Sequence, residues 1–302
     1  MNDQKFNAFI IGAQKAATSS LHFMLMQHPE VATLRAELPI FQYDYDSDEM
    51  KTLISRHNRS GESRRVLLLK RPDLLCDLKS IERIHEHNPE AKFICVLRNP
   101  VERAVSAALY AMKRGKMQVM SVDDALESSM DQNREKSVDE ARLCEYGLYG
   151  KYLKEWLGSF PSNNFLFLLN EEMQDAPSVM ARVCDFLGIQ KLDSYEGLSR
   201  SKQKSGIRSL FRLRLHSLIS LLVRQRDPKT GLTHLRSPRF IFRVVDVMFR
   251  YFDDWCLRHL FSSDSSCQLS DESRSRLYHY YANDLNNLTA LLDLDLSAWR
   301  RK

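Results

Sequence analysis

Close to the start of the chain, one lysine lies among small and hydroxyl-bearing residues between two apolar segments. The apolar run AFIIG ends at Gly12, and the lysine, Lys15, follows three positions later. The next residues are Ala16, Ala17, Thr18, Ser19 and Ser20. The backbone N–H groups at a helix N-terminus attract anions, and small residues let an anion approach them closely. Residues 15–20 are therefore a candidate anion-binding loop, although an ordinary strand-to-helix turn has similar residues.

The spacing of this loop differs from that of the common nucleotide-binding loops. A Walker A loop has the pattern Gly-x-x-x-x-Gly-Lys-Ser/Thr. Here Lys15 follows Gly12 without a Gly–Lys pair, and no Gly-x-Gly-x-x-Gly pattern follows the strand. The loop by itself indicates an anion without indicating which one.

A second set of polar residues follows the apolar run AKFICVL. Arg98 comes directly after this run, Pro100 begins a helix-like segment, and Ser106 lies further along that segment. The carboxyl ends of parallel strands border the ligand crevice of an open α/β sheet, and a guanidinium can bind a phosphate with two hydrogen bonds. Arg98 and Ser106 are candidates for holding a second anionic group. The alternative is that Arg98 pairs with Glu102 and Ser106 only packs.

Apolar runs and helix-like segments alternate over the first two thirds of the chain. The runs AFIIG, RRVLLLK, AKFICVL and NNFLFLL predict strands. The segments 18–27, 81–90, 101–115 and 179–189 predict helices. This alternation predicts an α/β fold with a doubly wound parallel sheet flanked by helices.

The region after residue 200 has a different pattern. Residues 207–226 and 239–261 are helix-like and mix apolar with basic side chains, and 273–292 predicts a last helix. The first interpretation is that these helices pack on the sheet or line a cleft. The alternative is a role at a membrane surface, because arginines flank the apolar residues.

The composition of the chain limits which kinds of partner and which cellular compartments we expect. The 302 residues include 44 basic and 39 acidic ones, a net charge of +5 that suits an anionic ligand but does not argue for nucleic acid. The six cysteines have no Cys-x-x-Cys spacing, which favours buried free thiols over a disulfide framework or a metal site. No signal peptide or membrane span is apparent. We therefore expect a soluble, cytoplasmic protein.

Two motifs together carry a family resemblance. GAQKAATSSL followed by LRNPVERAVS resembles the paired signatures of the sulfotransferases, enzymes that use 3′-phosphoadenosine 5′-phosphosulfate (PAPS). The form that the two motifs take here is similar to that of the carbohydrate, heparan-sulfate-like branch and its bacterial relatives. The resemblance implies one sulfotransferase domain over 1–302 with a fold like that of P-loop kinases. Within it, 1–200 would be the nucleotide-binding core, and 201–302 a helical acceptor-side and packing region.

The resemblance also implies how the donor is held. Residues 15–20 would bind the 5′-phosphosulfate, with Lys15 at its bridging oxygen. Arg98 and Ser106 would bind the 3′-phosphate. Related bacterial enzymes have a Pro-Arg-Ser-like segment near RSKQKSGIRS, which adds Lys204, Arg208 and Ser209 as candidates. For this last segment a solvated basic loop is the alternative.

Catalytic roles follow from the same resemblance. Lys70, at the end of RRVLLLK, would hold the sulfuryl oxygens, and Glu37 in AELPIF would act as general base. The chain departs from the family pattern at Ala36, where a lysine is usual, and at Leu69, where a glutamate is usual. The implied reaction moves a sulfuryl group in line to a hydroxyl or amine of a carbohydrate or small molecule. The alternatives are a P-loop-like small-molecule kinase and a non-catalytic nucleotide- or polyanion-binding module.

Overall fold

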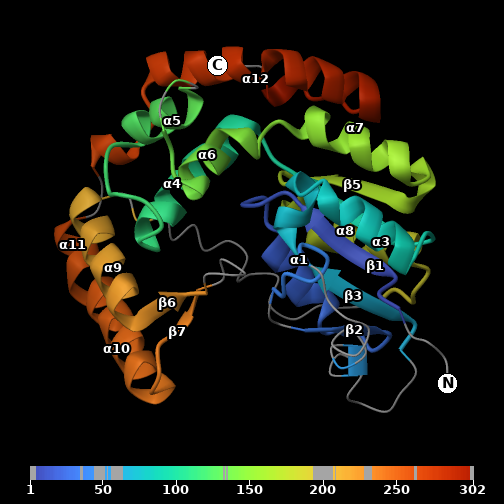
Figure 1. Ribbon diagram of the computed structural model, residues 1–302, viewed down its shortest axis with the longest axis horizontal. Coiled ribbons are helices and arrows are strands. Elements are labelled where there is room, and N and C mark those ends of the chain that lie inside the picture. The colour runs from blue at the N-terminus through green and yellow to red at the C-terminus, as the bar shows by residue number, and fades with distance from the viewer. Residues whose placement is uncertain are drawn as a thin grey trace. The chain divides into compact units, whose positions relative to one another are not determined.

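The computed structural model divides the chain into two compact units. It describes residues 5–34, 37–43, 52, 54–55, 64–131, 133, 135–192, 207, 209–227, 233–261 and 264–299. The first unit comprises Met1–Arg98, Tyr149–Gln203 and Ala290–Leu292, and the second comprises Asn99–Leu148, Lys204–Thr289 and Asp293–Lys302. The first unit contains a parallel sheet, whereas the second is mainly helical (Figure 1).

A five-stranded parallel sheet forms the centre of the first unit, with the strand order β2-β3-β1-β4-β5. The strands are β1 (Ala8–Gly12), β2 (Val31–Thr33), β3 (Val66–Lys70), β4 (Lys92–Leu97) and β5 (Phe165–Leu169). Because β1 lies in the middle and the chain winds outward to both sides, the predicted doubly wound α/β fold is confirmed. The edge strand β2 was not predicted, because three residues are too few to show a pattern.

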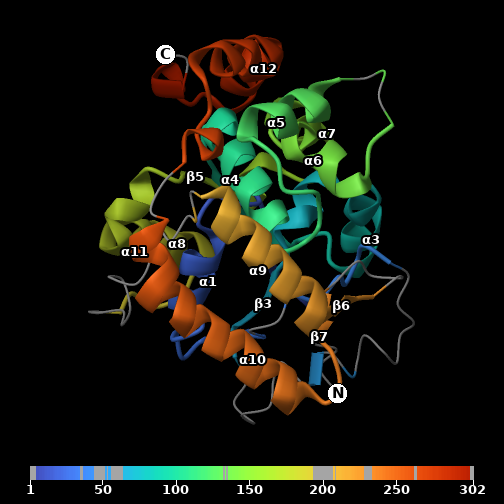
Figure 2. The same cartoon turned by 90° about the vertical axis from the view of Figure 1, so that its left-hand side faces the viewer.

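The central strands are apolar because helices cover both faces of the sheet (Figure 2). Every residue of β1 and β3 is buried. Phe9, Phe93 and Phe165 stack across β1, β4 and β5, with ring centroids 5.6 and 5.0 Å apart. The covering helices are α1 (Thr18–Leu25), α3 (Lys79–His87), α7 (Tyr149–Ser159) and α8 (Ala176–Leu187), with short 3-10 turns at Pro72–Cys76, Ser162–Asn164 and Glu172–Gln174.

The second unit is built around α4 (Pro100–Lys113). Asn99 caps this helix by accepting the Val101 N–H at 3.0 Å, and Gly115, just past its end, has a φ of 65°. The predicted Pro-initiated helix closed by a glycine is therefore confirmed. The other elements are α5 (Val122–Met130), α6 (Val138–Glu145), α9 (Leu210–Val223), the hairpin β6 (Arg224–Arg226) and β7 (Thr233–Leu235), α10 (Arg239–Phe252), a π-helical turn (Asp253–Leu257), α11 (Arg258–Leu260), α12 (Asp271–Leu292) and 3-10 turns at Ser265–Cys267 and Ser297–Trp299.

Predicted and observed helix limits differ by a few residues. The helix expected to reach residue 27 ends at Leu25, and the segment expected to be helical to residue 226 becomes strand β6 after Val223. Helices α5, α6 and α7 were not predicted. The helical region after residue 200 shares the second unit with residues 99–148. That 1–302 works as one sulfotransferase domain stays a prediction.

A buried polar cluster joins α9 to the turn that follows α10. Arg212 donates two hydrogen bonds of 2.7 Å to the carboxylate of Asp253, and the His216 Nε2 lies 3.0 Å from the same carboxylate. Burial alone would raise the pKa of Asp253, but hydrogen bonds from Arg212 and His216 hold that pKa below its usual value. This cluster stabilises the pairing of α9 with α10 because each buried polar group has a partner.

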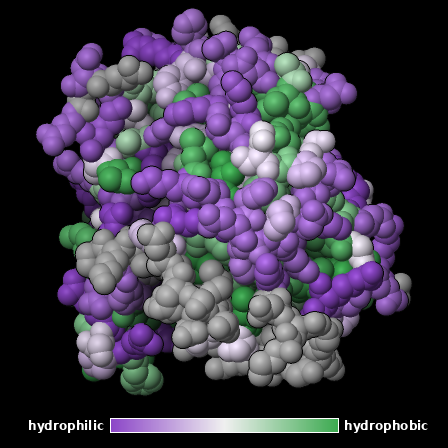
Figure 3. Space-filling view, turned by 45° about the vertical axis from the view of Figure 1, so that its right-hand side comes forward, coloured by the Kyte–Doolittle hydropathy of each residue, from purple (hydrophilic) through white to green (hydrophobic). Residues whose placement is uncertain are grey.

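Polar side chains cover much of the surface drawn in Figure 3, and most cysteines are buried. Hydrophilic side chains predominate on the face drawn in Figure 3, with smaller apolar areas among them. Four of the six cysteines are buried, whereas Cys76 and Cys256 are half-buried. Among the described helices, none is both long and apolar enough to cross a membrane. The described residues also contain no cluster of metal-ligating side chains.

Candidate active site

The anion loop joins the end of β1 to the start of α1. Lys15 and Ala17 have positive φ angles of 68° and 63°, so the backbone turns sharply twice within three residues. The Ala13 N–H donates to the Val96 carbonyl of β4 at 2.6 Å, which ties the loop to the neighbouring strand. Ala16 is fully buried. The small residues noted in the sequence are therefore needed for this tight path.

The N-terminus of α1 offers backbone donors to an anion. Among the described side chains, none caps this helix at Ala17. Thr18 is buried, whereas Ser19 is exposed. The first N–H groups of a helix have no carbonyl partner within it, and the helix dipole places partial positive charge there. This is the local structure that the sequence predicted for an anion-binding loop.

Lys70 brings β3, the anion loop and the segment of Glu37 together. It is the last residue of β3 and lies beside Ile10 of β1 in the sheet. Its Nζ donates to the Ser19 hydroxyl at 2.8 Å and forms an ion pair with the Glu37 carboxylate. The Lys70 side chain is 5% exposed and that of Glu37 is 41% exposed. Lys70 is thus a buried cation held between partners, whereas the Glu37 side chain remains partly open to solvent.

Arg98 lies at the same edge of the sheet. It follows β4 directly, and its Nη1 donates to the Lys15 carbonyl at 3.0 Å. Its own carbonyl accepts a hydrogen bond of 2.9 Å from the Tyr149 hydroxyl of α7. Glu102, the alternative partner considered for Arg98, forms an ion pair of 2.8 Å with Arg274. Arg98 therefore lies at the end of a strand, as predicted, but it contacts the anion loop directly, which the sequence did not predict. Its role in holding a second anionic group stays a prediction.

A polar network around the loop was missed by sequence reasoning. The buried Arg71 donates from Nε to the Gln42 Oε1 at 2.6 Å and pairs with Asp73 at 3.1 Å. Asp73 also accepts from the Gln14 side chain at 3.2 Å. Arg71 thereby links the segment 37–43, the corner after β3 and the anion loop. The signal that could have found it is its position: Arg71 follows a strand end, as Arg98 does.

The other predicted ligand residues lie in the second unit or outside the described residues. Ser106 is half-buried in the middle of α4. Ser209 is buried at the position before α9, where its side chain does not cap the helix. Lys204 and Arg208 fall outside the described residues. The roles of all four in nucleotide binding stay predictions.

Comparison with known proteins identifies the family. A family model described as a sulfotransferase domain matches residues 6–214, which is well over half of the chain. The chain belongs to the sulfotransferase family. The resemblance carried by the two motifs is thereby confirmed, and the matched range includes Lys15, Glu37, Lys70 and Arg98.

The curated relatives of this sulfotransferase are named as enzymes that act on heparan sulfate. Heparan sulfate glucosamine 3-O-sulfotransferase 6 of Mus musculus is 32% identical over 189 residues, which cover 61% of this chain and 53% of the relative. The human enzyme 3B1 of the same series is 30% identical over 190 residues, covering 61% of this chain and 46% of the relative. The chain thus spans about half the length of the curated relatives it matches.

A solved structure agrees with the fold of this sulfotransferase. The sulfotransferase from Alicyclobacillus acidocaldarius superposes with a TM-score of 0.65 at 22% identity, over 99% of this chain and 100% of that one. At this identity the match bears on the fold alone. The chemistry comes from the geometry of the first unit: two lysines, an arginine and a helix N-terminus gather where β1, β3 and β4 end, with a carboxylate beside them.

Proposed function

We propose that this sulfotransferase moves a sulfuryl group from PAPS to a hydroxyl of a carbohydrate acceptor by in-line displacement. The observation that carries the proposal is the contact of Lys70 with both Ser19 and Glu37. It places a cation and a candidate base next to a loop whose backbone donors suit an anion. An amine in place of the hydroxyl, or a small-molecule acceptor, is compatible with the same site.

The cationic side chains and the helix N-terminus of the first unit suit a donor that has anionic groups. The N-terminus of α1, Lys15 and Lys70 would hold the 5′-phosphosulfate, and Arg98 would hold the 3′-phosphate. For Ser106, a residue of the second unit, a share in the 3′-phosphate is implied by the family resemblance alone. The donor, when bound, supplies an activated sulfuryl group on a phosphate leaving group. The leaving oxygen gains negative charge in the transition state, and a lysine close to it stabilises that charge. We assign this role to Lys15.

Glu37 would take the proton of the acceptor hydroxyl. Its carboxylate is held by Lys70 and is partly exposed, so an acceptor hydroxyl can approach it from solvent. As the acceptor oxygen forms its bond to sulfur and the bond from sulfur to the leaving phosphate breaks, the hydroxyl proton passes to the Glu37 carboxylate. Lys70 would orient Glu37 and, with Ser19, stabilise the sulfuryl oxygens.

The relatives support a carbohydrate acceptor. The names of the curated relatives give glucosamine in heparan sulfate as their acceptor. We extend only the class to this chain, a sugar hydroxyl, because the match covers about half of each relative. The six free thiols support a further proposal, that the protein works in a reducing compartment such as the cytoplasm.

Calorimetry with 3′-phosphoadenosine 5′-phosphate, the desulfated product, tests the donor site. We expect Lys15→Ala and Arg98→Ala each to weaken its binding by roughly tenfold to a hundredfold, since each removes a charge-assisted contact. The matched control is Lys154→Ala on α7, an exposed lysine that should leave affinity unchanged. Binding that both site variants retain would reject this donor site. Preference for ATP with Mg²⁺ would favour the kinase alternative.

A labelled-sulfate assay tests the acceptor class. Purified protein is given sulfur-labelled PAPS with a panel of heparan-type oligosaccharides, neutral sugars, phenols and aliphatic alcohols. We expect label to appear on sugar hydroxyls and to depend on Glu37. Transfer only to phenols or alcohols would reject the carbohydrate class and keep the donor assignment.

A further inference from the structure

The outer face of α10 and of the turns that continue it is unusually apolar for an exposed helix. No residue of α10 is buried. Phe240, Met248, Tyr251 and Trp255 are 66–79% exposed, and Val244 is 40% exposed. Their spacing of four, four, three and four residues puts these five side chains in one stripe along the helix. We call them the apolar stripe.

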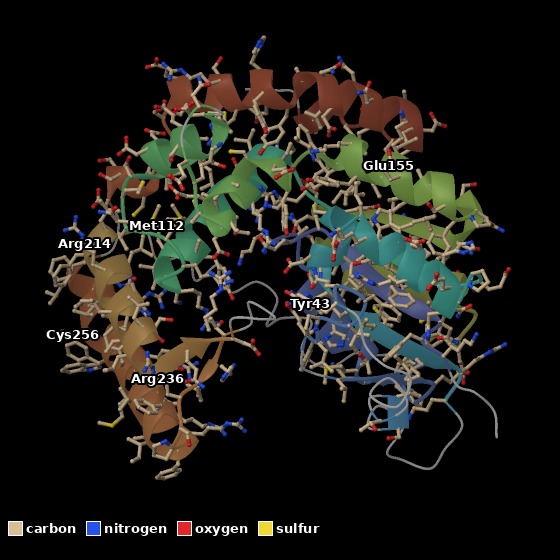
Figure 4. The ribbon with its side chains drawn as sticks, viewed as in Figure 1. Tyr43, Met112, Glu155, Arg214, Arg236 and Cys256 are labelled. Atoms are coloured by element: carbon tan, nitrogen blue, oxygen red, sulfur yellow. The ribbon has the colours of Figure 1, made fainter. Side chains whose placement is uncertain are left out.

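Arginines border this stripe. Arg239, Arg243 and Arg250 are exposed on α10, and their positions fall along the side of the helix next to the stripe. Asp246, on the same side, is already paired with Arg224 at 2.9 Å and with Arg250 at 3.3 Å. Arg214 of α9 and Arg236 after β7, both labelled in Figure 4, are exposed basic side chains of neighbouring elements. Asp254, next to Trp255, is also exposed, so the border carries acidic as well as basic side chains and has a net positive charge.

The apolar face continues onto α9 and α11. The rings of Phe211 and Phe261 pack against each other with centroids 4.6 Å apart, and both side chains are partly exposed. On α9, Leu218 and Leu222 are 62% and 58% exposed. Figure 2 shows α9 lying beside α10, with α11 continuing the end of α10. The exposed apolar residues thus belong to one helical layer rather than to scattered positions, and large exposed apolar patches mark interaction sites.

We propose that this layer docks on the surface of an anionic phospholipid bilayer. A helix with aromatic and methionine side chains on one face and arginines beside them matches the chemistry of the lipid headgroup boundary. The apolar stripe would enter the outer acyl region, and tryptophan and tyrosine would lie at headgroup level. The arginines would reach lipid phosphates while their aliphatic stems stay in apolar surroundings.

Charge and exposure argue against two other occupants of this face, a second copy of the chain and a soluble polyanion. In a symmetric dimer of this chain, the same basic border would face itself across the interface, and like charges would repel. A soluble polyanion would satisfy the arginines but would leave Trp255 and Phe240 in water. A bilayer with anionic lipids satisfies both sets of side chains at once. The proposal does not depend on the donor site, because the stripe and its arginines lie on α10 and the turn after it, which contain no predicted donor residue.

The helical layer is held together independently of any lipid. The buried cluster of Arg212, His216 and Asp253 fastens α9 to the end of α10, and Arg224 links the end of α9 to Asp246. Asp253 is buried and Asp246 is half-buried, whereas the residues of the stripe are exposed. Substitutions in the stripe therefore change the surface without removing a buried contact.

Tryptophan fluorescence can detect the docking in the intact protein. Of the three tryptophans, Trp156 and Trp299 are buried, so Trp255 reports on the exposed stripe. We expect vesicles of phosphatidylglycerol and phosphatidylcholine to shift the emission to shorter wavelength, and bromine-labelled acyl chains to quench it. Vesicles of phosphatidylcholine alone should have little effect. Raising the salt concentration should reverse the binding, because the arginine contribution is screened.

Cosedimentation of variants with vesicles measures the contributions of the stripe and of its arginine border to binding separately. Met248→Ser with Trp255→Ser should weaken binding at least tenfold, and Arg239→Gln with Arg243→Gln should weaken it by roughly fivefold for each arginine lost. The matched controls are Val138→Ser, an exposed apolar residue on α6, and Lys154→Gln on α7. Both controls should bind like the unmodified protein. Circular dichroism checks that each variant is folded before its binding is compared.

Several outcomes would overturn the proposal. One is no binding of the folded protein to anionic vesicles at low salt. A second is binding that the stripe double variant retains in full. A third is a concentration-dependent dimer, seen by sedimentation, that the stripe double variant abolishes, since this would assign the face to a second copy. Binding to heparin that persists in the stripe variant, without vesicle binding, would assign the arginines to a polyanion.

Discussion

At the scale of single residues, Lys70 decides how the site is assembled. It is a buried ammonium with two partners, Ser19 and Glu37, that come from different segments of the chain. A buried charge without partners would cost several kcal/mol, so these contacts hold Ser19 and Glu37 in place. The same contacts give Glu37 a defined orientation while leaving it partly exposed.

The residue-scale prediction concerns Glu37→Gln. The amide keeps the size of the side chain but cannot accept a proton as a base. We expect turnover to fall by about two to four orders of magnitude with affinity for 3′-phosphoadenosine 5′-phosphate unchanged. Steady-state rates and calorimetry measure the two effects.

The control for Glu37 is a glutamate far from the site in sequence and structure. Glu155 on α7, labelled in Figure 4, is exposed, and Glu155→Gln should leave both quantities unchanged. Undiminished turnover in Glu37→Gln would remove Glu37 as the base and would leave the donor site untouched.

At the scale of elements, Arg71 connects three segments that meet at the edge of the sheet. It contacts Gln42 and Asp73, and Asp73 in turn contacts Gln14 beside the anion loop. A lysine has one ammonium and cannot reproduce the two directions of a guanidinium fork. The network explains why the corner after β3 is polar although it is largely buried.

We expect Arg71→Met to lower the free energy of unfolding by about 2–3 kcal/mol, because Asp73 and Gln42 lose a buried partner. Arg71→Lys should recover only part of this loss. Urea unfolding measures the change, and the control is Arg65→Met, an arginine just before β3 whose side chain is 67% exposed. Equal stability of Arg71→Met and Arg65→Met would show that the network contributes little.

A histidine links the start of the chain to α3. The His87 Nε2 accepts a hydrogen bond of 3.0 Å from the Phe6 N–H, which requires a neutral ring. Burial, aided by the charge of Lys5, lowers the pKa of His87 from 6.5 to about 4. Protonation would therefore break this contact between the chain before β1 and helix α3.

Stability should consequently depend on pH. Since the pKa of His87 is lower in the folded state, the unfolded chain binds more protons between pH 6.5 and pH 4. The contribution is complete above pH 6.5 and is lost as the pH falls towards 4, by about 2 kcal/mol after solvent screening is allowed for. We expect His87→Gln to flatten this slope in urea unfolding, whereas His279→Gln, at an exposed position on α12, should keep it. An unchanged slope in His87→Gln would contradict the assignment.

At the scale of the whole molecule, the reactivity of the thiols reports on the packing around them. Cys95, Cys144, Cys184 and Cys267 are buried, whereas Cys76 and Cys256 are partly exposed. Burial raises the pKa of Cys267 to about 11 and also raises the pKa of Cys95 and Cys144, which lowers their thiolate fraction.

We expect a thiol reagent at pH 8 to modify two cysteines of the native protein quickly, Cys76 and Cys256, and all six after unfolding. Absorbance gives the number, and mass spectrometry of peptides gives the positions. The unfolded protein is the matched control, because it shows that the reagent modifies every cysteine once the cysteines are accessible. Rapid native modification of Cys95 or Cys144 would contradict the packing of β4 or of α6.

The sequence by itself determined the alternation of strands and helices and, through two motifs, the family. Strands β1, β3, β4 and β5 are visible because a parallel sheet covered on both faces needs uninterrupted apolar runs. Lys15 and Arg98 were found because each follows such a run. These signals lie within short stretches of sequence, so they can be recognised without knowing which other segments pack against them.

The tertiary structure alone decided which distant side chains meet. The Lys70–Glu37 pair joins segments 33 residues apart, and the Arg71–Gln42 bond joins segments 29 residues apart. Neither contact has a periodic pattern, because each depends on how β3 lies beside β1 and on the path of the segment 37–43. The division into two units and the exposure of the α10 stripe were also decided by tertiary packing. An amphipathic sequence shows which face of a helix is apolar, but packing decides what covers that face.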